Sequence, residues 1–188
     1  MKYTLVADTH LYSKYEVPGI RQKVLDLPAS RETVLLGDVV DRTCCDKKNI
    51  EIATQKHKQL TNLHRDNYLD GNHESMQPRA TCLTMNGILF THGDDEANPT
   101  KWRKYREKHK LGAGIVKKLF IMPFVSLFNE LVGGKPKAEF FERAASRTKF
   151  NRCHTYVCGH LHPKKLIDIK YDGVRIIVVP QGITEIEL

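Results

Sequence analysis

The sequence predicts one mixed α/β domain, with parallel strands in its first part and antiparallel hairpins in its second. Between residues 2 and 70, short apolar runs alternate with segments whose apolar residues recur at loosely helical spacing. This alternation favours parallel strands joined by right-handed helical crossovers. From residue 81 onward, two pairs of apolar runs flank turn residues, and such pairs are typical of hairpins. We therefore expect two mixed β-sheets packed as a sandwich, with helices on the outside.

The first part of the chain supplies the elements that are expected to be parallel. Apolar and β-branched runs predict strands over residues 2–7, 33–37 and 67–70. The segments between them predict a short helix within residues 19–27 and a longer one over residues 49–63. His57 and His64 stand among basic residues of this longer stretch and its end, and we expect both to face solvent.

The second part of the chain supplies the hairpins. Each is formed by two apolar runs on either side of a turn that contains glycine: residues 81–84 with 88–91, and residues 166–169 with 174–179. Residues 155–158 predict one further strand, and residues 99–150 are expected to be mostly helical.

Composition says little about function, but it limits the class of protein to which the chain can belong. The 188 residues suit a single domain, and 40% hydrophobic with 28% charged residues is ordinary for a globular protein. There is no uninterrupted apolar run of about 18 residues, so we expect no spanning helix, and the N-terminus resembles a first strand more than a signal peptide. Five cysteines, with Cys44 and Cys45 adjacent, favour reduced thiols and a cytoplasmic location.

Residues 95–150 are expected to form a helical cap inserted within the single domain of residues 1–188. Residues 101–149 carry 13 Lys and Arg against 4 Asp and Glu, and they hold all of the excess behind the net charge of +8. This charge is either a solvated helical face or a field that attracts a polyanionic substrate. The apolar stretch 114–128 is either a helix pair packed on the domain or a surface for an acyl chain, a membrane or a second subunit.

Polar clusters rich in Asp, Asn and His follow five of the strand-like runs. An unpaired charge beside a core is costly, so a carboxylate there is expected either to cap a helix or to bind a ligand. Five such clusters in one small domain indicate a common site. They are Asp8-Thr9-His10, Gly37-Asp38-Val39-Val40-Asp41-Arg42, Gly71-Asn72-His73-Glu74, Thr91-His92-Gly93-Asp94 and Gly159-His160-Leu161-His162.

The clusters offer two carboxylates, one amide and four imidazoles as metal ligands: Asp8, His10, Asp38, Asn72, His92, His160 and His162. Oxygen ligands suit hard divalent ions, and borderline ions such as Mn, Fe, Zn or Ni also take imidazole. Seven ligands exceed what one tetrahedral ion takes, so they predict two ions that share a carboxylate. We expect Asp38 to be this bridge, because its strand should be central in the sheet. Two ions about 3.5–4 Å apart can lower the pKa of a shared water and hold a phosphoryl group for in-line displacement.

Two further residues of the clusters have expected roles in catalysis. His73 stays outside the ligand set, and an imidazole beside the reacting phosphate can protonate the leaving oxygen. Arg42 offers a planar fork of N–H donors that suits a phosphate.

In their order along the chain, the clusters resemble the motifs of the calcineurin-like metallophosphoesterases. Those motifs are D-x-H, G-D-x-x-D, G-N-H-E or G-N-H-D, a histidine before a glycine, and G-H-x-H, and the resemblance runs from residue 3 to about residue 182. It implies a two-sheet α/β sandwich with metals at the strand ends. It also implies that His73 is the catalytic histidine and that Asp41 orients it. The implied ligands are Asp8, His10, Asp38 and His162 for one ion, and Asp38, Asn72, His92 and His160 for the other.

Two branches of this family share parts of the pattern. Residues 37–42 and 71–74 resemble the serine/threonine protein phosphatases, in which the arginine corresponding to Arg42 binds the phosphate. Residues 8–11 and 92–94, together with a helical insertion, resemble the UDP-diacylglucosamine pyrophosphatases of lipid A synthesis. The resemblance therefore names a superfamily and leaves the substrate open.

Residues and resemblance together predict a dinuclear metallophosphoesterase with two divalent ions, Mn²⁺ first and Fe, Zn, Ni or Mg as alternatives. The basic, partly apolar insertion favours a nucleotide- or lipid-linked phosphodiester or pyrophosphate as substrate. It would also suit nucleic acid or a membrane surface, since Trp102 and Tyr105 stand among its basic residues. The alternatives are a phosphomonoesterase similar to the protein phosphatases, and a non-catalytic scaffold such as the retromer subunit that resembles this family. The complete ligand set favours an enzyme.

Overall fold

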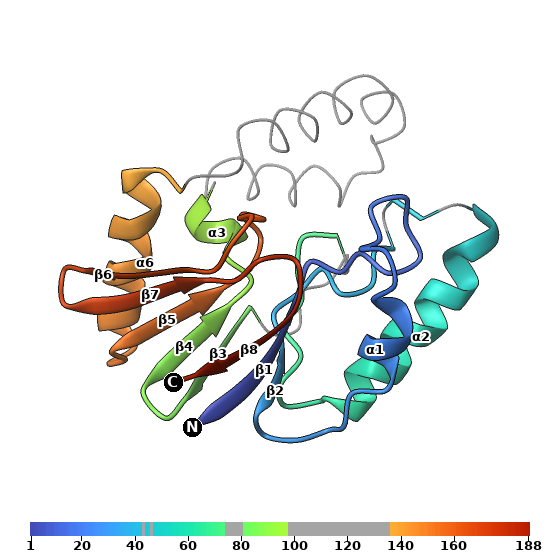
Figure 1. Ribbon diagram of the computed structural model, residues 1–188, viewed down its shortest axis with the longest axis horizontal. Helices are drawn as coiled ribbons and strands as arrows, with labels where there is room; N and C mark the ends of the chain where they lie inside the picture. Colours follow the sequence, from blue (N-terminus) through green and yellow to red (C-terminus); the bar gives the residue numbers. More distant parts are fainter. Residues whose placement is uncertain (43, 46, 74–80, 98–135) are drawn as a thin grey trace.

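The computed structural model describes residues 1–42, 44–45, 47–73, 81–97 and 136–188 (Figure 1). Most of the expected cap of residues 95–150 lies outside these ranges, as do Glu74, Trp102, Tyr105 and the apolar stretch 114–128. The cap therefore stays a prediction. None of the helices in the described ranges is long and apolar enough to cross a membrane.

The fold class predicted from the sequence, two mixed sheets flanked by helices, is confirmed. A three-stranded sheet has the order β2-β1-β8, and a five-stranded sheet has the order β3-β4-β5-β7-β6 (Figure 1). The strands are β1 Lys2–Ala7, β2 Thr33–Leu35, β3 Cys82–Met85, β4 Ile88–Thr91, β5 Thr155–Cys158, β6 Ile167–Tyr171, β7 Val174–Val178 and β8 Gly182–Glu187.

The smaller sheet differs from expectation at both edges. β1 pairs with β2 in parallel and with β8 antiparallel, and β8 was not predicted. The expected strand over residues 67–70 is reduced to one bridge, between Leu35 and Tyr68. Leu35 donates its N–H to the carbonyl of Asn67 and accepts the N–H of Leu69, both at 2.8 Å, before the chain turns away. These two hydrogen bonds form the single bridge between Leu35 and Tyr68, and the pairing of the two segments ends there.

The larger sheet has a parallel centre and antiparallel edges. β4, β5 and β7 run parallel, while β3 and β6 are joined to β4 and β7 as hairpins. Both predicted hairpins are confirmed. Their turns use two consecutive positive φ angles, 53° and 73° at Asn86-Gly87 and 46° and 80° at Asp172-Gly173, as type I′ turns require.

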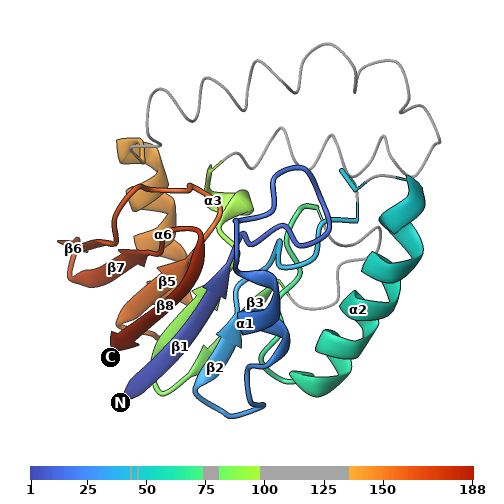
Figure 2. The same ribbon diagram turned by 45° about the vertical axis from the view of Figure 1, so that its right-hand side comes forward.

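Helices cover the outer face of each sheet (Figure 2). α1 Arg21–Leu25 and α2 Ile50–Leu63, which follows a 3₁₀ turn at Lys47–Asn49, pack on the smaller sheet. α6 Ala138–Phe150 packs on the larger sheet beside the short helix α3 Asp94–Ala97. Both predicted helices of the first part are therefore present.

The expectation that His57 and His64 face solvent is wrong. His57 is 8% and His64 is 4% exposed, because both lie on the inner face of the α2 segment. The ring of His57 meets that of Tyr68 edge-on, with centroids 5.5 Å apart, and its Nε2 lies 3.8 Å from a carboxylate oxygen of Asp70. The basic neighbours of His57 and His64, on which the expectation of exposure rested, belong to the opposite face of the helix.

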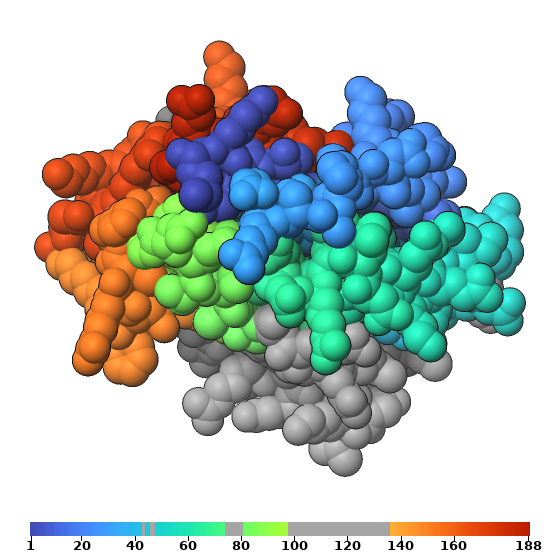
Figure 3. Space-filling model, turned by 90° about the horizontal axis from the view of Figure 1, so that it is seen from below, coloured from blue at the N-terminus to red at the C-terminus, as the bar shows by residue number. Residues whose placement is uncertain are grey.

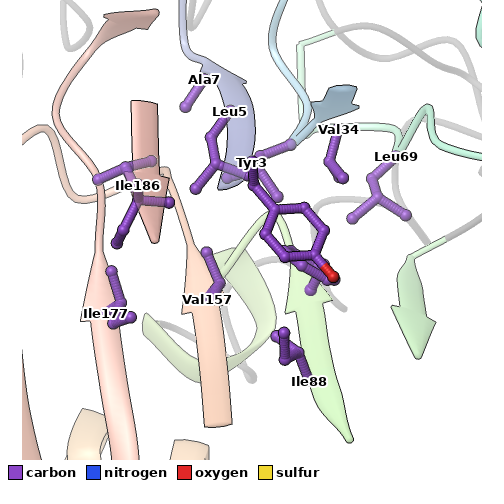
Figure 4. Packing of buried hydrophobic residues seen from close by; sticks show 12 residues of the cluster. Tyr3, Leu5, Ala7, Val34, Leu69, Ile88, Val157, Ile177 and Ile186 are labelled. Atoms are coloured by element: carbon purple, nitrogen blue, oxygen red, sulfur yellow. The ribbon is translucent and has the colours of Figure 1, made fainter. Parts of the chain in front are cut away.

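The main core lies between the two sheets. Leu5 and Val34 of the smaller sheet face Val157 and Ile88 of the larger one (Figure 4), and the Tyr3 and Phe90 rings pack with centroids 5.5 Å apart. The first and last residues lie side by side at one end of this sandwich (Figure 1), where the amino group of Met1 donates to the Leu188 carbonyl at 2.7 Å. In Figure 3 the blue N-terminal segment accordingly lies beside the dark red C-terminal segment. The opposite end receives the carboxyl ends of the parallel strands β1, β2, β4 and β5, and hence the polar clusters that follow them.

Candidate metal centre

The loops after β1 and β2 run side by side and place their aspartates in the interior. The N–H of Asp8 donates to the carbonyl of Gly37 at 3.1 Å, and that of His10 donates to the carbonyl of Asp38 at 3.0 Å. The carboxylates then bind the other loops. Asp8 Oδ2 accepts the N–H of His160 and Asp38 Oδ1 accepts the N–H of His73, both at 2.7 Å. Each aspartate thus joins its own loop to one that is distant in the sequence.

Five of the predicted ligands have backbone angles that L-residues rarely adopt. Asp8, His10, Asp38, His160 and His162 have φ values of 52°, 48°, 52°, 62° and 45°. Residues in this region cost about 1–3 kcal/mol each and concentrate at functional sites, where the surrounding structure holds them in place. The strain is therefore concentrated at the strand ends that carry the donors.

Two glycines are needed because other groups approach their backbone closely. A Cβ on Gly71 would lie 2.1 Å from Asp38 Oδ1, and one on Gly159 would lie 2.5 Å from Asp8 Oδ2. Such contacts are far inside van der Waals distance. The glycines of two motifs thus make room for the two carboxylates.

The first group of donor atoms comes from Asp8, His10 and His162, which lie within 4.8 Å of one another. His162 Nε2 is 3.0 Å from Asp8 Oδ1. His10 Nδ1 lies 3.2 Å from Asp41 Oδ2, which leaves Nε2 of His10 for an ion. This group has one carboxylate and two imidazoles.

The second group comes from Asp8, Asp38, His92 and His160, again within 4.8 Å. His92 Nδ1 donates to the carbonyl of Leu36 at 2.9 Å, so Nε2 is its ligand nitrogen. Around this Nε2 lie Asp38 Oδ2 at 3.3 Å, Asn72 Oδ1 at 3.1 Å and His160 Nδ1 at 3.1 Å. These oxygen and nitrogen atoms converge on one place, where a positive centre would satisfy them together. The donor set therefore fits a divalent ion.

The titratable residues of the second group shift one another's pKa values. Burial raises the pKa of Asp8, but the charge and hydrogen bond of His162 outweigh it and lower that pKa to about 2. Against burial, the charge of His92 holds the pKa of Asp38 well below its usual range. Burial lowers the pKa of His92, but Asp38 raises it to about 10, whereas burial and His92 lower the pKa of His160 to about 3. The carboxylate of Asp38 thus favours positive charge at His92, and that charge disfavours a proton on His160.

A third group lies beside the first. His10, Asp41 and His73 offer donor atoms within 4.8 Å of one another, and His73 Nδ1 is 3.4 Å from Asp41 Oδ2. The Asp41 side chain is fully buried, and that of His73 is 18% exposed. Arg42 follows Asp41 in the same loop and is half-buried.

The structure thus brings together the seven predicted ligands and the predicted pair of Asp41 and His73. Asp8 is common to both ligand groups, whereas Asp38 belongs to the second. The expected bridge at Asp38 stays a prediction, as do the ion-binding and catalytic roles. Cys44 was not singled out from the sequence, although its Sγ lies 3.8 Å from His73 Nδ1. Its position three residues after Asp41 was the available signal.

Comparison with known proteins gives distant structural matches. No protein-family model and no curated protein matches the chain. Vacuolar protein sorting 29 from Cryptosporidium parvum matches with 15% identity and a TM-score of 0.44, over 94% of this chain and 72% of that one. A cold-active protein-tyrosine phosphatase of a psychrophilic Shewanella species matches with 16% identity and a TM-score of 0.48, over 99% and 75%. Because the identities are 15% and 16% and both TM-scores are below 0.5, we infer function from the site alone.

Proposed function

We propose that this protein is a metal-dependent phosphoesterase that hydrolyses a phosphodiester or a pyrophosphate. The observation that carries the proposal is the convergence of two donor groups on one shared carboxylate, Asp8. One group contains Asp8, His10 and His162, and the other contains Asp8, Asp38, His92 and His160, with Asn72 beside it. The ends of four strands, and the loop that carries Asn72, thus bring their donor atoms to one place.

These residues would hold two divalent ions, with Mn²⁺ as our first expectation. Such ions, when bound, acidify a water molecule and neutralise charge on the phosphoryl oxygens. The protein fixes the donors before any ion arrives, because backbone N–H groups hold Asp8 and Asp38 at 2.7 Å. Fixed donors lose little conformational entropy on binding, which favours tight and geometrically defined sites.

His73 is proposed to give a proton to the leaving oxygen. Asp41 contacts Nδ1 of His73, so Nε2 is left for the substrate. The backbone N–H of His73 donates to Asp38 Oδ1, and this hydrogen bond fixes the backbone at His73. Arg42, which directly follows Asp41, is proposed to bind a phosphate oxygen through the planar N–H donors of its guanidinium group.

Hydrolysis of two model esters tests the proposal. The purified protein is stripped of metal, and Mn, Ni, Zn and Mg are added back separately to assays with p-nitrophenyl phosphate and bis-p-nitrophenyl phosphate. We expect metal-dependent turnover with a preference for the diester, in keeping with the phosphodiester or pyrophosphate that the proposal names. Turnover of the monoester alone would favour a phosphomonoesterase. A chain that binds metal but hydrolyses neither ester, nor a nucleotide or lipid-linked pyrophosphate, would support a scaffold.

A further inference from the structure

The loop after β1 has a strained backbone bend two residues beyond the predicted ligand His10. Tyr12 has a φ of 70°, in a region that bulky L-residues rarely adopt, and His10 itself has a φ of 48°. Such angles cost about 1–3 kcal/mol each and persist only where the surrounding structure holds them. We propose that Glu16 is a positioning residue, which holds this bend and thereby sets His10 for metal binding.

The carboxylate of Glu16 holds the bend through the backbone of Tyr12. Glu16 Oε2 accepts the N–H of Tyr12 at 2.7 Å, and the Glu16 side chain is only 17% exposed, so this bond is largely shielded from water. Arg21, the first residue of α1, fixes the carboxylate by donating from Nε at 3.0 Å and from Nη2 at 2.6 Å. Its guanidinium also lies over the Tyr12 ring, 4.5 Å from the centroid. Glu16 and Arg21 together therefore hold both the backbone and the ring of Tyr12.

The same loop is bonded to the backbone of His10. The His10 carbonyl accepts the N–H of Ser13 at 3.2 Å and the Ser13 hydroxyl at 3.0 Å. Val17 donates its N–H to the carbonyl of Thr9 at 3.1 Å, and this bond closes the loop directly after Glu16. The backbone of His10 thus belongs to a closed loop that Glu16 braces from one side. Release of the bend would let this backbone rotate.

A rotation of His10 would affect one ligand group and spare the other. His10 belongs to the first group, with Asp8 and His162, and is absent from the second. Its Nδ1 lies 3.2 Å from Asp41 Oδ2, so a turn of the ring would also weaken the contact that leaves Nε2 for an ion. Loss of a contact that orients a ligand lowers metal affinity about 10–100-fold. The effect on metal rests on the proposed function, whereas the positioning of His10 by Glu16 does not.

Manganese binding tests the proposal. Metal-stripped protein is titrated with Mn²⁺, and the free ion is measured by electron paramagnetic resonance. His162→Gln identifies the ion of the first group, because His162 belongs to that group alone. We expect Glu16→Ala to bind this ion about tenfold more weakly and the other ion as the wild type does. Glu16→Gln retains an acceptor for the Tyr12 N–H and should recover most of the affinity. Equal weakening of both ions in Glu16→Ala, or of neither, would overturn the proposal.

Asp168→Ala is the matched control. Asp168 accepts from Arg175 Nε at 3.1 Å and from Nη2 at 2.7 Å, much as Glu16 accepts from Arg21, but at the end of the sandwich where the first and last residues lie. This variant should bind both ions with wild-type affinity. If Glu16→Ala does not fold, Arg21→Leu takes its place, because it removes the cation that fixes Glu16. It should weaken the same ion, and unchanged binding of both ions would overturn the proposal.

A second measurement needs no ion. The rings of His10 and His73 are nearly perpendicular, with centroids 5.1 Å apart, so their protons should show a nuclear Overhauser effect in the metal-free, histidine-labelled protein. We expect this effect in the wild type and in Asp168→Ala, and we expect Glu16→Ala to lose most of it. Its full persistence in Glu16→Ala would overturn the positioning of His10. A wild-type chain that shows the effect but binds no ion would instead contradict the proposed function.

Discussion

Asp41 connects two histidines that have different proposed roles. Its Oδ2 lies 3.2 Å from Nδ1 of His10 and 3.4 Å from Nδ1 of His73, and its side chain is fully buried. A carboxylate in this position selects the tautomer and orientation of each ring. It leaves Nε2 of His10 for the proposed ion and Nε2 of His73 for the proposed substrate. In the proposed mechanism, one side chain therefore positions both the metal-binding and the proton-donating histidine.

Substitution of His73 should separate these two roles. We expect His73→Gln to retain its ions and to lose about 10²–10⁴-fold in kcat on a diester with an alkyl leaving group. The loss should be much smaller with a p-nitrophenyl leaving group, because that oxygen departs without needing a proton. The control is His154→Gln, an exposed histidine directly before β5, at the other end of the sandwich. An equal loss on both esters would show that His73 is not the proton donor.

His64 should make stability depend on pH. Both of its ring nitrogens are buried without a hydrogen-bond partner among the described residues, and burial lowers its pKa below 6.5. The unfolded chain therefore takes up a proton first as pH falls, so folding stability is full above about pH 6.5 and decreases below it. Melting temperatures between pH 7.5 and 5.5 should fall less for His64→Leu than for the wild type or the exposed control His154→Leu. Identical slopes in all three proteins would contradict this account.

At the scale of elements, a buried ion pair connects the His92 loop to the outer helix. Arg147 of α6 contacts the carboxylate of Glu96, which is 3% exposed, and Arg143 donates to the Glu96 carbonyl at 2.6 Å. Glu96 belongs to α3, which begins two residues after His92. The pair therefore holds the end of β4, and with it one of the predicted ligands, against α6.

Removal of the arginine should destabilise the fold. Arg147→Leu leaves Glu96 buried without its cation, which costs about 3–5 kcal/mol of unfolding free energy. Lys149→Leu is the matched control, because Lys149 on the same helix pairs with Asp172 at the surface and contributes about 0–1 kcal/mol. Urea unfolding at constant pH measures both. A loss below about 1 kcal/mol for Arg147→Leu would show that the pair does not hold α3 on α6.

Strands and hairpins could be predicted where the sequence pattern that defines them is local. Apolar runs followed by polar clusters located β1, β2, β4 and β5, and Asn86-Gly87 located a hairpin. β8 was missed because Gly182–Glu187 has only two large apolar residues, Ile183 and Ile186, three positions apart, and its partner strand lies about 180 positions away. His57 was misjudged because its partner Asp70 lies in another element. Both errors, at β8 and at His57, therefore involve contacts between residues that are distant in the sequence.

At the scale of the whole molecule, the core between the sheets holds the strand ends in register. Leu5 in β1 is fully buried in this core, three residues before Asp8. Leu5→Ala should lower the unfolding free energy by about 2–5 kcal/mol, because the cavity cannot fully collapse between two sheets. Leu166→Ala, at a side chain that is 40% exposed, is the control and should cost much less. Similar losses in urea unfolding for both would contradict the sandwich core.

The site was predictable in its residues but not in its geometry. Five motifs in order named the residues that the structure places together. The sequence could not show that Asp8 is common to both donor groups, because that depends on how two sheets pack. Nor could it show the positive φ angles of Asp8 and Asp38, since aspartate seldom adopts them without support from the surrounding fold. That Cys44 lies beside His73 is visible only in the folded loop.

The number of metal ions bound per chain tests the central claim most directly. Metal-stripped protein is dialysed against Mn²⁺, and bound metal is counted by atomic absorption for the wild type and for Asp38→Asn, with circular dichroism to confirm folding. We predict two ions per wild-type chain, a melting temperature that rises with Mn²⁺ concentration, and at least one ion lost in Asp38→Asn. A folded wild-type chain that binds no ion, or an Asp38→Asn chain that binds two with unchanged affinity, would contradict the account.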